Sequence, residues 1–373
     1  MRPGMRCLLE LLRGESVDRL IDEAEWEAVL ALAEEEHVLP YAAARMRSRQ
    51  GSLMPAISAR LDQIERDAAI AAFYWSSELK GVLRAFGQRE IRVVPLKGPF
   101  LADRLYGATA LRVSRDLDLL VAQADLARAD AVLTAIGFVP GDRDDYHHPW
   151  YRETTTVELH YDVENPLAFD FDVGSALLGL HPAVFLGECC WQLAPDDELL
   201  FLCLHAARHR FERLSLIVDL QLAFEKLPVI ASGWQPRPEV AGLSSLLTLG
   251  LAMARRLRPD IAASVTLSGS RKQAEYLEML ADRLWTRLLT ESSEALDWRA
   301  VHSFFLEIES PGWPRLRRRC RHLQILLSRV IAPDYVFAAQ FGLHQDWQVH
   351  MLRPLRLLSE AIWPLRGDGR RAG

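Results

Sequence analysis

Residues 91–121 read IRVVPLKGPFLADRLYGATALRVSRDLDLLV, and this stretch decides the fold. It starts with a short apolar run of strand length, continues through a glycine turn and a short helix, and ends in a second apolar strand that carries Asp116 and Asp118. Side chains two positions apart on a strand share a face and lie about 6.6 Å apart. The two carboxylates therefore point the same way, while Leu117 and Leu119 enter the core.

Acidic and glycine residues around these strands indicate a site for metal and phosphate. Two carboxylates held this close repel each other, and a hard cation such as Mg²⁺ relieves that repulsion. The turn at Gly98 opens a helix, where free backbone N–H groups can bind phosphate. A third acid, Glu158, lies with His160 and Asp162 on the polar face of the strand predicted over residues 155–163, TTVELHYDV. Metal and phosphate together indicate nucleotide chemistry.

The Asp-x-Asp pair alone is weak evidence, because short acidic pairs also stand at solvated strand ends. Here the strand around the pair is otherwise very apolar, and burying unpaired charge is costly. If the strand with Glu158 pairs beside this one, three carboxylates converge on one sheet face. They would suit one or two metal ions, and two ions can clamp the attacking and leaving oxygens of an in-line displacement at phosphorus.

Composition and charge limit the class of protein. The chain has 373 residues, 50% of them hydrophobic and 25% charged, which is enough for two or three domains with a sizeable core. Its net charge of −6 argues against broad nucleic-acid binding. The five cysteines lack zinc-site spacing and are expected to be reduced thiols. No signal-peptide pattern and no apolar run of 18 residues is present, so we expect a cytoplasmic protein without a membrane span.

Hydrophobic periodicity predicts an α/β (α+β) fold, with a small mixed-sheet core set between two helical regions. Residues 1–88 are expected to be an N-terminal helical region, residues 89–165 the core, and residues 166–373 a C-terminal helical region. Apolar stripes and Gly stops predict helices over residues 26–46, 57–86, 99–106, 123–136, 196–210, 214–227, 242–257, 271–289 and 312–330.

Four segments together resemble the uncharacterised bacterial nucleotidyltransferase family of the DNA polymerase beta superfamily. They read VPLKGPFLADRLYG, RVSRDLDLLV, TVELHYDV and LHAARHRFERLSLIVDL, and the resemblance covers roughly residues 30–260. The family pattern has a Lys-Gly turn, a Leu-Tyr, an Arg before Asp-x-Asp, a Gly-Phe or Gly-Tyr and a Leu-His. In this chain these fall at Lys97-Gly98, Leu105-Tyr106, Arg112, Asp116 and Asp118, Gly137-Phe138, and Leu159-His160.

The resemblance implies a small mixed-sheet nucleotidyltransferase core and an enzyme that moves a nucleoside monophosphate from an NTP to an acceptor hydroxyl or phosphate, releasing pyrophosphate. It also implies a set of site residues. Asp116, Asp118 and Glu158 would hold Mg²⁺, two ions in all, with Glu158 either a second-metal ligand or the base for the acceptor. Gly98 would bring backbone N–H groups to the phosphates, and Lys97, Arg112 and Arg115 would neutralise the leaving pyrophosphate.

One departure from the wider superfamily keeps other functions open. The usual turn is Gly-Ser, whereas this chain has Gly98-Pro99 and so lacks the hydroxyl that would touch a phosphate. This favours a second hypothesis, a non-catalytic nucleotide-binding or regulatory protein on the same scaffold. A phosphotransferase using the same face is a third, weaker one. For an enzyme, the acidic charge makes a small molecule, peptide or protein a better acceptor than long nucleic acid.

Histidine pairs and a basic run are further candidates. His205 and His209 share a helix face, but two histidines leave a metal site short of ligands, so packing or substrate contact is the better interpretation. His147-His148 precedes Pro149 and is expected in a loop without a ligand role. The basic run over residues 315–321, RLRRRCR, suits a solvated helix face or an anionic partner.

Overall fold

The computed structural model describes residues 1–15, 21–49, 54–143, 146–163, 171, 173–227, 244–261, 271–292 and 298–308. Residues Met1–Ser310 form one compact unit. The helix predicted over residues 312–330 and its basic run lie outside the described residues. Within the compact unit the three-part division into helical, core and helical regions remains a proposal.

The N-terminal region is helical, as predicted. Helices α1 (Met5–Arg13), α2 (Glu23–Glu35) and α3 (Leu39–Arg49) pack against one another. Asp22 caps α2 by accepting a hydrogen bond from the Glu25 N–H, which satisfies one of the free donors at the helix start.

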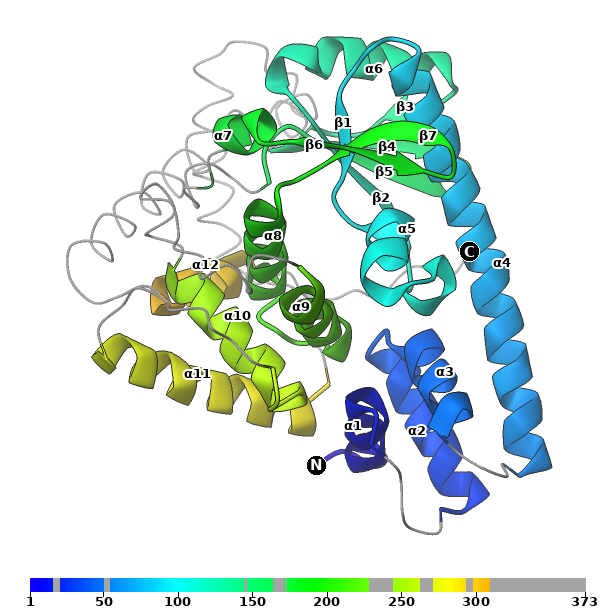
Figure 1. Ribbon diagram of the computed structural model, residues 1–373, viewed down its shortest axis with the longest axis vertical. Coiled ribbons are helices and arrows are strands. Elements are labelled where there is room, and N and C mark those ends of the chain that lie inside the picture. The colour runs from blue at the N-terminus through cyan, green and yellow to red at the C-terminus, as the bar shows by residue number, and fades with distance from the viewer. Residues whose placement is uncertain are drawn as a thin grey trace, which may run out of the picture. The chain divides into compact units, whose positions relative to one another are not determined.

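The long helix α4 (Pro55–Gly87) follows, with proline at its first turn. It runs from the N-terminal helices to the sheet (Figure 1). Its first half packs with the N-terminal helices through Ile57, Leu61 and Ile64. Its second half packs under the sheet in a separate apolar core, through Leu79, Val82, Leu83 and Phe86. Helix α4 is therefore shared by two cores.

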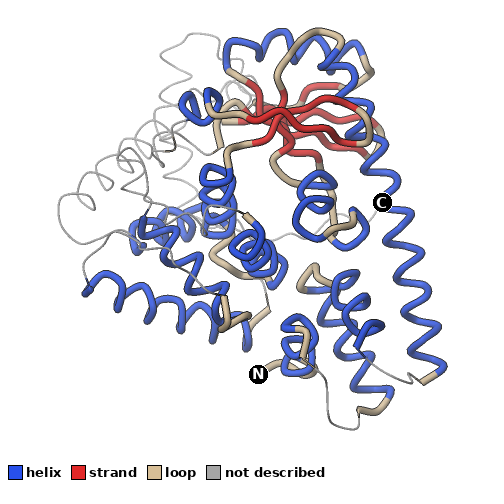
Figure 2. Tube along the Cα trace, in the orientation of Figure 1, coloured by secondary structure: helices blue, strands red, loops and turns tan. Residues whose placement is uncertain are grey.

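The predicted mixed sheet is present and has five strands in the order β1-β2-β5-β4-β3. Strands β2 and β5 are parallel, and the other pairs are antiparallel. The strands lie together in one layer with helices around them (Figure 2). The bounds are β1 Val93–Pro95, β2 Leu117–Val121, β3 Val139–Pro140, β4 His147–Arg152 and β5 Thr155–His160.

Two details of the sheet differ from the sequence-based expectation. His147 and His148 belong to strand β4 and not to a loop, because residues 147–152 pair antiparallel with β5 along its whole length. Strand β5 ends at His160, three residues before the predicted end. Val163 lies beyond the strand and packs in a different apolar core from Val157.

The connection between β1 and β2 is helical, as predicted, but irregular. It comprises α5 (Gly98–Leu101), a π-helical turn η1 (Ala102–Tyr106) and a 3₁₀ turn η2 (Thr109–Leu111). The expected helix after β2 is present as the 3₁₀ turn η3 (Gln123–Asp125) and α6 (Leu126–Ala135).

The described residues from 173 to 308 are largely helical, as predicted. Residues 181–192, however, form a hairpin that the sequence analysis did not predict. It turns at Leu186 and Gly187, whose φ values of 48° and 85° are those of a tight hairpin turn. The elements are α7 (Val173–Leu178), β6 (His181–Phe185), β7 (Glu188–Gln192), α8 (Pro195–Arg208), α9 (Leu214–Lys226), α10 (Ser244–Leu257), α11 (Arg271–Thr290) and α12 (Trp298–Ile308). None of the helices in the described residues is long and apolar enough to cross a membrane.

Candidate functional site

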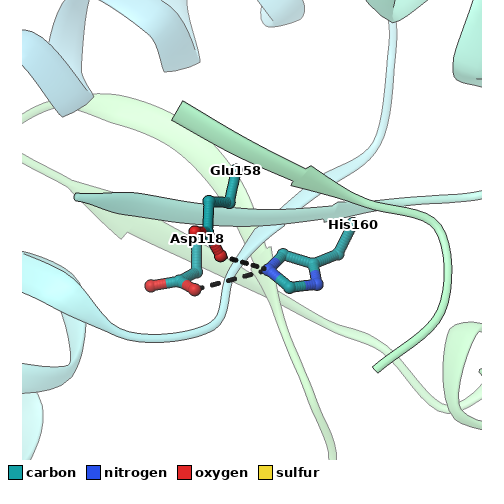
Figure 3. A group of neighbouring side chains, drawn as sticks. All are labelled: Asp118, Glu158 and His160. Carbon is teal, nitrogen blue, oxygen red and sulfur yellow. Dashed lines mark hydrogen bonds and ion pairs between the residues drawn. The ribbon is translucent and has the colours of Figure 1, made fainter. Parts of the chain in front are cut away.

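The parallel pairing of β2 and β5 brings two acids side by side. Asp118 and Glu158 are register partners on these strands, and His160 follows two positions later on the same face of β5. One ligand atom from each of the three residues lies within 4.8 Å of the others (Figure 3). The pairing on which the sequence-based expectation for Glu158 depended is therefore present.

Asp118 is the centre of this cluster and is only 2% exposed. Its Oδ1 lies 2.9 Å from Lys97 Nζ and 3.3 Å from His160 Nε2. Its Oδ2 is buried without a hydrogen-bond partner. Burial alone would raise the pKa of Asp118, but the cation of Lys97 and the hydrogen bond with His160 outweigh burial and hold this pKa below its usual value. Asp118 is therefore an anion, and its Oδ2 is free to coordinate a metal ion.

His160 lies between the two acids. Its Nε2 is 3.5 Å from Glu158 Oε2, and the same atom faces Asp118 (Figure 3). Burial would lower the pKa of His160, yet hydrogen bonds to Asp118 and Glu158 raise it. The hydrogen bond from His160 in turn lowers the pKa of Glu158. The alternation in the sequence predicts the face of His160 correctly but assigns this residue no role. Its place two positions from Glu158, on the same face of β5, could have indicated that it belongs to the site.

Asp116 lies just before β2, in the bend that leads into the strand. Burial, together with the negative charge of Asp118, raises its pKa to about 6. It is not one of the three residues whose ligand atoms come within 4.8 Å of each other. The charges of Asp118, Lys97 and Glu158 nevertheless act on the pKa of Asp116, so this residue lies at the edge of the cluster.

Gly98 supports this end of the sheet as the predicted turn residue. Its φ is 64°, a conformation that side chains rarely adopt, and its Cα faces the Asp116 carbonyl. Just before it, the Leu96 N–H donates to the Asp118 carbonyl at 2.9 Å. A backbone hydrogen bond therefore connects the turn that carries Lys97 and Gly98 to strand β2.

The three predicted cations have different surroundings. Lys97 is ion-paired with Asp118, as described above. The Arg112 guanidinium donates to both carboxylate oxygens of Asp219 on α9, with Nε–Oδ1 and Nη2–Oδ2 distances of 2.9 Å. The Tyr106 hydroxyl donates to the same carboxylate at 2.6 Å. Arg115 is exposed. Arg112 therefore joins the acidic strand to α9, which sequence reasoning missed because the two partners are far apart in the chain.

Aromatic residues extend the site from His160 towards α8. The His147 ring stacks on the His160 ring with centroids 5.4 Å apart, and the Tyr146 ring lies tilted against His147 with centroids 4.5 Å apart. Arg208 of α8 lies over the Tyr146 ring and donates to its hydroxyl. This row of aromatic rings connects Arg208 of α8 with His160 of the acidic cluster, a link that no local sequence pattern indicates.

His205 and His209 stand at the end of α8, with ring centroids 4.7 Å apart. Burial and the cation of Lys97 lower the pKa of His205 well below its usual value. Burial, Arg208 and Lys97 lower the pKa of His209 to about 4. Both imidazoles are therefore neutral at pH 7 and close enough to Lys97 to feel its charge. Neither belongs to the metal-capable group found among the described residues.

Asp118, Glu158 and His160 could hold a divalent cation. The buried, unpartnered Oδ2 of Asp118 is an acceptor that a cation would satisfy. Two carboxylates are the ligands that Mg²⁺ prefers, and an imidazole beside them extends the choice to metals such as Mn²⁺. The residues present therefore fit the metal expected from the sequence.

Residues 22–259 match the model of a family described as an uncharacterised nucleotidyltransferase, and the chain belongs to that family. No curated protein sequence matches the chain.

Solved structures with some similarity include two of the antibiotic-resistance factor ANT(2'')-Ia. One is a solution structure, at 14% identity over 57% of this chain and 94% of that one, with a TM-score of 0.29. The other is a crystal structure in complex with adenylyl-2''-tobramycin, at 14% identity over 57% and 97%, with a TM-score of 0.30. A third is an antigenic nucleotidyltransferase-like protein from Paracoccidioides brasiliensis, at 17% identity over 52% and 93%, with a TM-score of 0.36.

Proposed function

We propose that this member of the nucleotidyltransferase family is an active enzyme, which transfers a nucleoside monophosphate from an NTP to a small-molecule, peptide or protein acceptor and releases pyrophosphate. One observation carries the proposal: Asp118 and Glu158 are register partners on adjacent strands, and Asp118 keeps one buried oxygen without a partner. Most buried polar atoms have a hydrogen-bond partner, so an unpartnered Oδ2 beside a second acid on the next strand suits a metal ligand.

Asp118, Glu158 and Asp116 would hold the metal, with His160 beside them. A bound divalent cation such as Mg²⁺ supplies charge neutralisation on the transferred phosphoryl group. The acceptor oxygen attacks the α-phosphorus, and the bond from that phosphorus to the bridging oxygen breaks. Pyrophosphate leaves with the electron pair of this bond. Glu158 takes the acceptor proton, because its side chain is 32% exposed and so more accessible than that of Asp118.

Lys97, Gly98 and Arg115 are the proposed phosphate contacts. Lys97 has its ammonium group at the carboxylate of Asp118, where an NTP would bring its phosphates. Gly98 opens α5 and presents backbone N–H groups at its start. Arg112 acts differently, because both carboxylate oxygens of Asp219 accept hydrogen bonds from the Nε–Nη2 edge of its guanidinium. We assign Arg112 to positioning the strand that carries the acids.

A non-catalytic nucleotide-binding protein is the alternative, and two observations favour it. Pro99 stands where the wider superfamily has a hydroxyl residue, and Lys97 neutralises Asp118 in the structure. Such a protein would bind NTP tightly and release no pyrophosphate.

An assay with α-³²P-labelled NTPs separates the two functions. The purified protein is incubated with each NTP, Mg²⁺ or Mn²⁺, and a small-molecule extract of cells. An active enzyme gives pyrophosphate together with a labelled product, and Asp118→Asn abolishes both. Saturable NTP binding without pyrophosphate under every metal condition would select the non-catalytic alternative.

A further inference from the structure

A cavity of about 470 Å³ lies between α4, the N-terminal helices and the segment that leads into β2. A cavity of this volume can enclose a drug-sized molecule. Pro99, the residue after the Gly98 turn, lines it, and so do Ser114 and Arg115, which directly precede Asp116. The cavity therefore lies beside Asp116 at the edge of the acidic cluster, and Arg115 is the lining residue already proposed as a phosphate contact.

The wall on α4 is apolar apart from Arg60 and Asp67. Ile64, Ala68, Ala72 and Trp75 line the cavity from successive turns of the helix. This part of α4 lies between the two apolar cores: Ile64 is its last residue in the first core, and Leu79 is its first in the second. The small alanine side chains leave the space open, and Trp75 offers a ring surface at one end. A ligand here would bury apolar surface against the helix.

The charges around the cavity cancel. Glu34 and Asp67 contribute two negative charges, and Arg60 and Arg115 contribute two positive ones. Burial, together with the cations of Arg213 and Arg115, lowers the pKa of His37 to about 4, so His37 is uncharged at pH 7. The remaining guanidinium, that of Arg112, is neutralised by Asp219. A strongly cationic or anionic ligand would find no net counter-charge in this cavity.

The position of the cavity suits an acceptor better than the triphosphate. In an in-line displacement the acceptor oxygen and the leaving pyrophosphate lie on opposite sides of the α-phosphorus. The cations of Lys97 and Arg208 both lower the pKa of His209 at the end of α8, so both lie within electrostatic reach of this residue. Helices α8 and α4 lie on opposite sides of α5 and β2 (Figure 1). When pyrophosphate departs towards the cations of α8, the α4 side remains open to the acceptor.

We propose that this cavity is the acceptor site and that it takes a small molecule with an apolar, largely uncharged body and a nucleophilic hydroxyl group. The proposal rests on the nucleotidyl transfer proposed above. The acceptor body lies along Ala68 and Ala72, and its hydroxyl points towards Asp116. The hydroxyl oxygen forms the new bond to the α-phosphorus, its proton goes to Glu158, and pyrophosphate departs with the electrons of the broken bond.

The neutral fluorophore N-phenyl-1-naphthylamine tests the cavity without any need for activity. Ala68→Leu fills the cavity, whereas Ala69→Leu makes the same change at the next residue, which is exposed and does not line it. Leucine keeps the helix propensity high in both variants. We expect saturable binding to the wild type and to Ala69→Leu, and at least 10-fold weaker binding to Ala68→Leu. Equal affinity of the two variants would overturn the assignment of a ligand site to the cavity.

Label transfer from α-³²P-NTP then tests the acceptor class. We expect transfer to 2-(1-naphthyl)ethanol, which is neutral and apolar, and not to tobramycin, which is polycationic. Ala68→Leu should lower this transfer at least 10-fold with the KM for NTP unchanged, and Ala69→Leu should match the wild type. Transfer to tobramycin alone would overturn the acceptor class. Fluorophore binding that depends on Ala68, without transfer to any acceptor or any pyrophosphate release, would overturn the proposed function and leave only a ligand-binding cavity.

Discussion

Asp118 on β2 and Glu158 on β5 are register partners on adjacent parallel strands. Their separation is set by the backbone hydrogen bonds of the sheet and not by flexible loops, so the two carboxylates are held ready before any ligand arrives. A site built on strands is positioned more firmly than one built on loops. Four of the predictions below concern this pair and the residues in contact with it or beside it.

Asp118→Asn should reduce nucleotidyl transfer on the order of 10²-fold or more, because it removes a metal ligand and the anion that Lys97 and His160 contact. Initial rates of pyrophosphate release measure the loss. Asp103→Asn, an exposed carboxylate on η1, is the matched control and should keep full activity. Wild-type rates for Asp118→Asn would refute the metal assignment.

Glu158→Gln should cut turnover and spare NTP binding, because Asp118 remains to hold the metal that accompanies the phosphates. Isothermal titration with a non-hydrolysable NTP gives the affinity, and labelled product gives the rate. Parallel losses of affinity and rate would show instead that Glu158 is needed for the first metal.

Lys97→Ala should raise the KM for NTP more than it lowers kcat, if its ammonium contacts the phosphates equally in the ground and transition states. Steady-state kinetics over a range of NTP concentrations separates the two effects. Equal losses in kcat and kcat/KM would place the contact of Lys97 on the leaving pyrophosphate in the transition state.

Asp116 should make the metal-free protein less stable as pH rises. Its pKa in the folded chain is raised to about 6, so between about pH 4 and pH 6 the folded state holds a proton that the unfolded state has lost. Stability therefore falls across this window and stays lower above it. Asp116→Asn should raise the melting temperature at pH 8 in EDTA and leave it nearly unchanged at pH 4. A stabilisation of the same size at both pH values would contradict the assignment.

Asp219→Asn should destabilise the fold by about 3–5 kcal/mol, because it leaves the Arg112 guanidinium buried without its counter-charge. Urea unfolding measures the change. Asp125→Asn breaks an exposed ion pair with Arg128 and should cost about 0–1 kcal/mol. A similar small cost for Asp219→Asn would mean that Arg112 is solvated or finds another partner.

Local patterns made the acidic strand predictable. The alternation around Asp118, and again around Glu158, is a property of a few consecutive residues, and it predicted the face that Glu158 shares with His160. Asp116, in contrast, stands in the bend before β2 and not in the strand. The pairing of β2 with β5 could be stated only as a condition, because no local signal specifies which strands become neighbours.

Contacts between distant segments could not be predicted in this way. Arg112 and Asp219 lie 107 positions apart in the chain, and nothing in the sequence around either residue indicates that the two form an ion pair. Strand β4 contains Pro149, which disfavours a central strand because proline cannot donate a backbone hydrogen bond. Strand β3 pairs with β4 only at Trp150 and Tyr151, so the ladder on that side needs no hydrogen-bond donor at Pro149. The cavity beside α4 arises from how three segments meet, and the alanines that line it read simply as helix formers.

The sharing of α4 between two cores has a consequence for how the chain can change in length. One inserted residue turns the second half of a helix by about 100° and moves it about 1.5 Å. An insertion between Ile64 and Leu79 would therefore swing Leu83 and Phe86 out from under the sheet while Ile57 and Leu61 stayed in place. Additions of about seven or eleven residues, which leave the two faces about 20° out of line, nearly restore both of them. A variant that lengthens α4 and keeps both cores packed would therefore add about 10 or about 16 Å of helix beside the cavity.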